Sequence, residues 1–457
     1  MLACNRSNAV SPTAAGFSSL RAISNTATAS FTLICVSTAS IHHSISLQTP
    51  SPSSIISKIV SPPANSRAET STRSFRYLNP ARKSAASTTH NTPHTAPQPP
   101  ASTPPHPISL HLPEFPEEHE GLNIEFNWSL ADDDVTPHGD AFRNLSWPKL
   151  AQLAQQQKPA GKKAAIQEVD VSVVFNDFEG LYEQVTEHLS TEPSLYTQDG
   201  AVGSFKDERT RVRVISDSPL VALFAQSLLV RVPTKDPHAA RPIVLYVATG
   251  GEFKGKEPQA QLLVDNDDEG ATFVKVVITG NADLATVKDA IGLAKKKLLE
   301  VAESESLVVP ADVLLKDDKT ALVFNATGAG RAAAINRGQL YSAHLNIWNA
   351  VGVTSLFGGA IVDDATKVSK KQVVAVEGGS AVNVPCNNLV EHPKAAVFVD
   401  KAGKGVKSIS PAEAAALFKK VDADADAEKF EALLKKAETK SFVVSSDAEV
   451  EAALAKL

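Results

Sequence analysis

Residues 321–336 carry the side chains and spacing with the clearest chemical potential. They form a short apolar strand, a glycine turn and a helix start, the context in which a phosphate-binding loop holds a nucleotide. Gly328 and Gly330 keep the turn, but Arg331 stands at the position of the loop's lysine and Ala332 at that of its hydroxyl. Arginine keeps the charge without the compact ammonium group, and alanine cannot bind a metal ion.

We therefore interpret this stretch as a glycine turn that leads into a packed helix. A nucleotide site formed by Thr327, Gly328, Gly330 and Arg331 is then vestigial. The alternative is a working loop in which Arg331 contacts phosphate.

Other groups that could do chemistry give weaker patterns. Asp132–Asp134 and Asp265–Glu269 lack the wider spacing of calcium loops, so we expect solvated turns. The 12 histidines are scattered, and we identify no metal-type pair on one helix and no metal site. Cys4, Cys35 and Cys386 form no Cys-x-x-Cys pair, which favours a reducing compartment and a buried, inert Cys386.

The elements that must position these residues alternate between strands and helices. Helical spacing occurs at 181–189, 218–230 and 285–302. Strands are predicted at 211–215, 242–247, 272–278, 307–309, 321–324, 354–362, 395–399 and 442–444. Two capping boxes, Ser410–Glu413 and Ser446–Glu449, predict helix starts near the C-terminus. The sequence therefore predicts an α/β (mixed α+β) protein.

Composition limits the class of function. The chain has 457 residues, 43% hydrophobic and 21% charged, with a net charge of −6. This is the composition of an ordinary globular protein, and it gives no direct signal of nucleic-acid binding. No apolar run approaches the roughly 18 residues that a membrane span needs.

Residues 1–110 differ from the rest of the chain. Glu69 is the first acidic residue and Glu114 the next, while Ser, Thr, Ala and Pro dominate. This acid-poor, arginine-containing composition is typical of organelle targeting peptides, and a Pro-rich linker follows at 92–107. We expect a disordered targeting and linker region and mitochondrial import, with plastid or cytosol as alternatives. Simple disorder or an overlong gene model would also give this composition.

An ordered set of segments resembles the ATP-dependent phosphoenolpyruvate carboxykinase family. Residues 210–233 resemble a strand and helix of its N-terminal domain, and Val247–Phe253 resembles its Asn-Ala-Gly-x-Phe segment. Residues 321–333 stand where the family has a strand followed by Gly-Leu-Ser-Gly-Thr-Gly-Lys-Thr-Thr. Asn346–Val351 resembles Ile-Trp-Asn-Ala-Ile, and His392–Phe398 resembles His-Pro-x-Asn-Val-Ile-Phe.

The resemblance implies a shortened two-domain carboxykinase-like fold. We place an N-terminal domain at 111–302 and a C-terminal domain with a degenerate phosphate loop at 303–457. The family uses ATP, Mg²⁺ and Mn²⁺ to convert oxaloacetate into phosphoenolpyruvate, CO₂ and ADP. Lys295 and Lys296 match its paired lysines, one of which binds a metal ion.

Most of the family's other active-site motifs have no match here. The Gly-Asp-Asp-Glu-His metal motif and the Thr-Gly-Arg-Ser-Pro substrate segment are both unmatched. Without those partners we expect Lys295 and Lys296 to be solvated surface lysines and expect no cofactor. A lost electrostatic donor typically costs about 10²- to 10³-fold in rate, so the losses predict an inactive protein.

We therefore expect an inactive carboxykinase-like protein that serves as a structural or accessory subunit of a larger protein complex in an organelle, with the mitochondrion as the first choice. The first alternative is an active ATP-dependent carboxykinase that uses Lys295, Lys296 and Arg331 at phosphate and metal. The second alternative is an unrelated α/β protein with coincidental matches.

Overall fold

The structure is a computed structural model that describes residues 117–119, 121, 128–170, 177–232, 242–266, 270–369, 372–384 and 389–457. These residues belong to one compact unit, Ser102–Leu457. The expectations for the targeting and linker region at 1–110 and for Cys386 lie outside the described residues. The domain boundaries after residues 110 and 302 stay predictions.

The first half of the described chain builds an eight-stranded mixed sheet in the order β1-β2-β4-β5-β6-β8-β7-β3. Its strands are β1 (Glu118–His119), β2 (Asp140–Arg143), β3 (Ile166–Val169), β4 (Ser194–Val202), β5 (Thr210–Ser216), β6 (Ile243–Ala248), β7 (Gln259–Asn266) and β8 (Thr272–Thr279). β5, β6 and β8 run parallel at its centre. Because both faces of these central strands are covered, most of their residues are buried.

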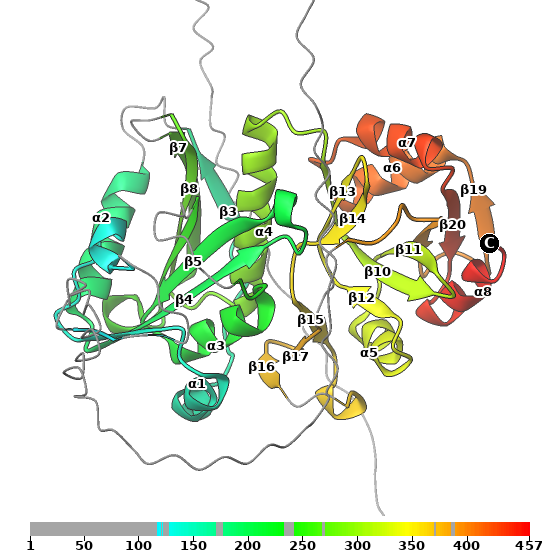
Figure 1. Cartoon of the computed structure of the whole chain (residues 1–457). Helices are drawn as coiled ribbons and strands as arrows, with labels where there is room; N and C mark the ends of the chain where they lie inside the picture. The colour runs from blue at the N-terminus through cyan, green and yellow to red at the C-terminus, as the bar shows by residue number, and fades with distance from the viewer. Residues whose placement is uncertain are drawn as a thin grey trace, which may run out of the picture. The chain divides into compact units, whose positions relative to one another are not determined.

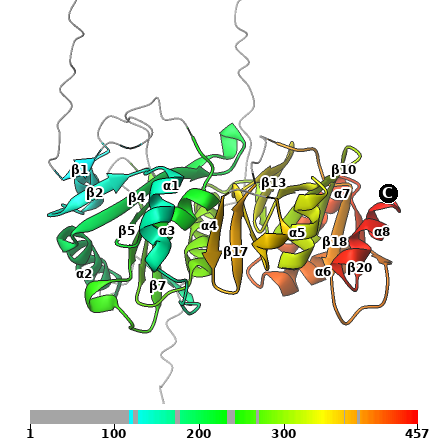
Figure 2. The same ribbon diagram turned by 90° about the horizontal axis from the view of Figure 1, so that it is seen from below.

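Helices cover both faces of this sheet (Figures 1 and 2). α1 (Trp147–Leu153), α3 (Pro219–Leu228) and α4 (Leu284–Val301) share one core with the sheet. α2 (Asp177–Thr191) packs through Phe178, Val185 and Leu189 against the other face. The predicted helices at 181–189, 218–230 and 285–302 are therefore confirmed, with Ser218 and Asp283 as N-caps of α3 and α4.

The second half builds a six-stranded sheet in the order β12-β10-β11-β18-β20-β19. Its strands are β10 (Ala311–Lys316), β11 (Lys319–Phe324), β12 (Leu340–Ser342), β18 (Ala395–Val399), β19 (Lys407–Ile409) and β20 (Lys440–Val444). α5 (Gly328–Asn336) and α8 (Val450–Leu454) cover one face, and α6 (Pro411–Val421) and α7 (Ala427–Lys436) cover the other. The predicted strand at 442–444 is confirmed in β20.

Two three-stranded sheets complete the fold. One joins β9 (Leu307–Val309), β13 (Asn346–Asn349) and β14 (Gly352–Ser355), and the other joins β15 (Gly359–Val362), β16 (Val373–Val376) and β17 (Gly379–Asn383). The prediction of one strand at 354–362 is wrong. The extended run is interrupted between β14 and β15, where the N–H of Gly358 donates to the carbonyl of Leu228 on α3 at 2.7 Å.

The two predicted capping boxes have different outcomes. Ser410 and Glu413 form the expected reciprocal box at the start of α6. The prediction of a capping box at Ser446 is wrong, because Glu449 accepts from the backbone N–H and hydroxyl of Ser445 at 2.7 and 2.8 Å. A 3-10 turn, η6 (Asp447–Glu449), leads into α8 instead of a longer helix.

The mixed α/β class is confirmed. Within the described residues, no helix combines the length and apolarity that crossing a bilayer requires.

Candidate functional site

The glycine turn lies between β11 and α5, as the sequence predicts. Asn325 follows the strand with a φ of +59°, a conformation that asparagine tolerates better than most residues. Thr327 is the N-cap of α5, and its hydroxyl accepts from the N–H of Gly330 at 3.1 Å. The free N–H groups at such a helix start attract anions, which is the physical basis of phosphate binding there.

A carboxylate from the C-terminal segment already occupies this helix start. The hydroxyl of Thr327 donates to Asp447 Oδ2 at 2.5 Å, and its N–H donates to Asp447 Oδ1 at 3.3 Å. A Cβ added at Gly330 would lie 2.5 Å from Asp447 Oδ1. Glycine at this position therefore allows a protein carboxylate to approach, in the place where a phosphate loop would hold its ligand.

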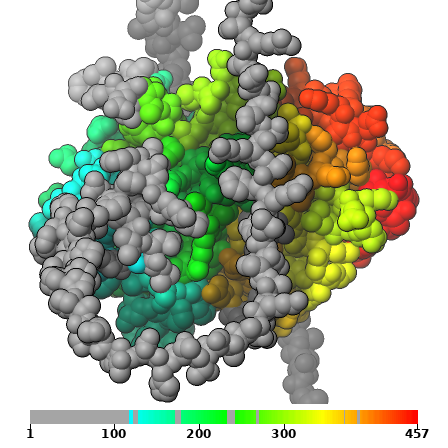
Figure 3. Space-filling model, in the orientation of Figure 1, coloured from blue at the N-terminus to red at the C-terminus, as the bar shows by residue number. Residues whose placement is uncertain are grey.

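A second acid lies beside the turn, and ion pairs hold the C-terminal segment next to it. A Cβ at Gly328 would collide with the carboxylate of Asp363, so a second acid lies beside the same helix start. Glu451 on α8 forms ion pairs with Lys316 on β10 and with Arg337, the C-cap residue directly after α5. Figure 3 shows the red C-terminal residues directly beside the yellow-green β10–α5 region.

Arg331, the residue at the lysine position, has its own acidic partner. Its Nε donates to Asp312 Oδ2 at 2.8 Å and Oδ1 at 3.1 Å, and its Nη1 donates to the carbonyl of Ile361 at 3.3 Å. The backbone N–H of His344 also donates to Asp312, at 2.9 Å. Burial raises the pKa of Asp312, and Arg331 and these hydrogen bonds oppose that rise. Arg331 thus neutralises a buried carboxylate.

The remaining space beside the turn is small. A cavity of about 20 Å³ is lined by residues that include Asp312, Arg331 and Asp447, and it has room for about one water molecule. Ala332 presents a methyl group where a magnesium-binding hydroxyl would stand. A triphosphate and its metal ion therefore do not fit these residues as they are arranged.

Lys295 and Lys296 both lie on α4, but their side chains have different partners. The expectation that both are solvated is wrong for Lys295, whose side chain is buried and donates to Thr210 Oγ1 at 2.9 Å. Burial lowers the pKa of Lys295, and the charge of Glu208 opposes the change. Lys296 donates to Asp422 at 3.4 Å. Each cation is thus engaged by groups other than those that hold Arg331.

The expectation of a solvated turn at Asp132–Asp134 is also wrong for one member. Asp133 pairs with the fully buried Arg213, with Nη1 and Oδ2 2.6 Å apart. Asp199 binds the same guanidinium from β4, with Nε and Oδ1 2.8 Å apart. These contacts join the strand β5 to its neighbours and serve the core of the sheet.

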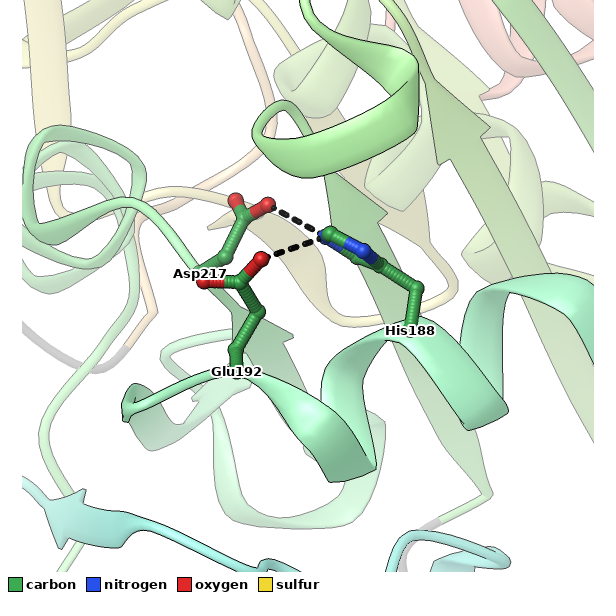
Figure 4. A group of neighbouring side chains, drawn as sticks. All are labelled: His188, Glu192 and Asp217. Atoms are coloured by element: carbon green, nitrogen blue, oxygen red, sulfur yellow. Dashed lines mark hydrogen bonds and ion pairs between the residues drawn. The ribbon is translucent and has the colours of Figure 1, made fainter.

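Sequence reasoning missed a second cluster of polar side chains. His188 on α2, Glu192 directly after α2, and Asp217 directly after β5 point toward one another (Figure 4). His188 Nε2 lies 3.0 Å from Asp217 Oδ2 and 3.4 Å from Glu192 Oε1. The hydrogen bond to Asp217 raises the pKa of His188. The spacing of four residues between His188 and Glu192 was a readable signal, whereas the third member comes from a distant strand.

Comparison with known proteins identifies the chain's relatives. A region 25% identical to the phosphoenolpyruvate carboxykinase (ATP) of Staphylococcus haemolyticus covers 49% of this chain and 42% of that protein. The enzyme of Staphylococcus aureus is 26% identical over 45% of this chain and 39% of its own length. The chain thus matches about two fifths of the length of these curated relatives. The profile of the phosphoenolpyruvate carboxykinase family matches residues 156–398, more than half of the chain, which therefore belongs to the phosphoenolpyruvate carboxykinase family.

Proposed function

We propose that this family member does not catalyse the carboxykinase reaction and instead serves as a structural or accessory subunit of a larger protein assembly in an organelle, the mitochondrion in the first instance. The observation that carries the proposal is the Asp447 carboxylate at the start of α5, hydrogen-bonded to Thr327. A carboxylate thus already accepts from the N-cap residue, at the place where a nucleotide phosphate would have to lie.

Electrostatics add to this steric argument. Two like charges about 4 Å apart near a protein surface repel by about 4 kcal/mol at an effective dielectric constant of about 20. Asp447 and Asp363 both border the helix start, and Asp312 holds the nearest guanidinium, that of Arg331. A triphosphate approaching the turn would meet two acids without a free cation at the lysine position. Transfer of a phosphoryl group depends on neutralising its charge, which these residues do not provide.

The proposed place in an organelle rests on residues 1–110. These 110 residues contain one acidic residue, Glu69, and several arginines, a composition that favours import. Import can be tested by fractionating cells that express the full chain with a C-terminal tag. Enrichment in the cytosolic fraction, without a shortened product in the organelle, would contradict the proposed compartment.

Nucleotide binding is the direct test of the proposed loss of catalysis. The full chain is heated with ATP and either Mg²⁺ or Mn²⁺, beside the Staphylococcus haemolyticus carboxykinase as positive control. A ligand at about 100 times its Kd stabilises a folded protein by about 2.7 kcal/mol, so binding would be visible. We expect no shift for this chain and no phosphoenolpyruvate from oxaloacetate. A shift that Arg331→Met abolishes, with phosphoenolpyruvate formed, would establish the active alternative instead.

The assembly role needs a separate measurement. Organelles containing the tagged chain are solubilised in mild detergent and separated by size under native conditions. We expect the chain in a particle several times its own mass that survives moderate salt, with the same protein partners in independent preparations. Migration as a free 48.4 kDa chain or its cleaved product would contradict a subunit role.

A further inference from the structure

We propose that His188, Glu192 and Asp217 form a binding site for a divalent transition-metal ion, with Zn²⁺ as the best match. The three side chains converge from α2 and the end of β5, and their donor atoms all lie within 4.8 Å of one another (Figure 4). The site is independent of the glycine turn, and the inference does not rest on the proposed function.

The donor spacing fits a small tetrahedral ion. Zinc binds imidazole nitrogen and carboxylate oxygen at about 2.0–2.2 Å, which puts neighbouring donors about 3.3 Å apart in a tetrahedron. His188 Nε2 lies 3.0 Å from Asp217 Oδ2 and 3.4 Å from Glu192 Oε1. Both distances are close to that spacing, and the carboxylate oxygens of Asp217 and Glu192 lie within 4.8 Å of each other, so a modest approach of the two carboxylates would place all three atoms around one ion.

The fold orients the ligand side chains before a metal ion binds. Glu192 directly follows α2, and its N–H donates to the carbonyl of His188 at 3.1 Å, so the last helical turn presents both side chains on one face. Asp217 is held by the N–H and hydroxyl of Thr249 and by the N–H of Gly250, which donate at 2.7–3.1 Å. Such supporting hydrogen bonds orient ligating carboxylates in metal sites.

The site is closed on one side and accessible on the other. The side chains of His188 and Asp217 are only 7% and 3% exposed, whereas that of Glu192 is 24% exposed. A Cβ on Gly250 would lie 3.1 Å from Asp217 Oδ2, and one on Gly251 would lie 3.3 Å from Glu192 Oε1. The two consecutive glycines thus leave the space beside the donor atoms free of their own side chains. The exposed side of Glu192 gives a metal ion its path of entry.

The position in the sheet supports a ligand site. Asp217 and Thr249 directly follow the adjacent parallel strands β5 and β6, and ligands of open α/β sheets bind beyond the carboxyl ends of such strands. One imidazole and two carboxylates favour zinc among the abundant divalent ions, because Mg²⁺ and Ca²⁺ prefer all-oxygen shells with more ligands. Two carboxylates also balance the ion's charge.

The test uses Co²⁺ as a spectroscopic probe and Zn²⁺ as its competitor. The full chain, stripped with a chelator, is titrated with Co²⁺, and the visible absorption of a low-coordinate ion is followed. We expect one equivalent to produce these bands, one equivalent of Zn²⁺ to abolish them, and Zn²⁺ to raise the melting temperature by joining α2 to β5.

Matched variants separate this site from incidental binding by other residues. Glu192→Gln keeps a polar side chain of the same size at a partly exposed position, so we expect it to fold and to bind Co²⁺ at least tenfold more weakly. His188→Gln should remove the bands. Glu187→Gln, an exposed glutamate on the same helix, should bind like the wild type. A wild-type chain without bands, or equal binding by the wild type and Glu192→Gln, would overturn the proposal and leave these residues a buried ion-pair network.

Discussion

Replacing Arg331 with methionine separates a structural arginine from a phosphate-binding one. If Arg331 serves chiefly to neutralise Asp312, its loss leaves a buried carboxylate without its cation, and the folded state suffers before any ligand is added. If Arg331 instead waits for a phosphate, the unliganded protein should tolerate its removal. Methionine preserves much of the apolar length of the side chain, so the change chiefly removes the guanidinium.

The expected cost follows from the burial of Asp312. Its side chain is 4% exposed, and after the substitution its remaining hydrogen-bond donor among the contacts described above is the N–H of His344. Removing one partner of a buried ion pair typically costs about 3–5 kcal/mol. We therefore expect Arg331→Met to lower the free energy of unfolding by that amount at pH about 7.

A double-mutant cycle tests the reasoning by urea denaturation. Asp312→Asn removes the buried charge, so the double variant with Arg331→Met should lose clearly less stability than the sum of the two single changes. Arg337→Met provides a matched control, because that arginine is more exposed and pairs with Glu451 at 3.4 Å. Its loss should cost at most about 1 kcal/mol. An Arg331→Met chain as stable as the wild type, or simple additivity in the cycle, would refute the structural role.

Three further perturbations probe other parts of the fold. Arg213→Met should cost about 3–5 kcal/mol in urea denaturation, because Asp199 and Asp133 would lose their shared buried cation; a loss below 1 kcal/mol would contradict this. Ser410→Ala should cost about 1 kcal/mol by removing the N-cap of α6, measured against the unchanged chain. Burial holds the pKa of His344 well below its ordinary value of 6.5, so the unfolded chain binds more protons at mildly acidic pH and stability falls as the pH drops below about 6.5. Between pH about 7 and about 5.5, the free energy of unfolding should fall by about 1.3 kcal/mol more for the wild type than for His344→Asn. Asparagine is chosen because it tolerates the φ of +72° at this position. Equal losses in the two proteins would show that His344 is not the group responsible.

Local patterns predicted much of the architecture because they reflect local physics. The helical spacing at 285–302 and the capping box at Ser410 are decided within a few residues, and both predictions are confirmed. The strand predicted at 354–362 failed because its interruption is tertiary. Gly359 approaches α3 so closely that a Cβ there would lie 2.5 Å from the carbonyl oxygen of Ser227. Nothing in the apolar run itself signals that neighbour.

The candidate site divides in the same way. The turn at Gly328 and Gly330 could be read from the sequence, as could the position of Lys295 on the buried stripe of α4, four residues after Ile291. Treating Lys295 as a solvated residue gave charge more weight than helical position. Asp447, by contrast, lies 120 residues from Thr327, and only the folded chain brings them together.

The glycine turn and the Asp447 carboxylate form one physical unit. The turn creates backbone and hydroxyl donors that need an acceptor, and leaving such groups unpaired in a packed site costs about 1–3 kcal/mol each. Asp447 supplies that acceptor through Thr327, so the turn stays stable without any bound anion. ATP would have to displace Asp447, break both of its contacts, and still find Arg331 committed to Asp312. The turn can therefore persist as a structural feature after its phosphate-binding role is lost, and the glycines alone are a poor guide to whether a nucleotide binds.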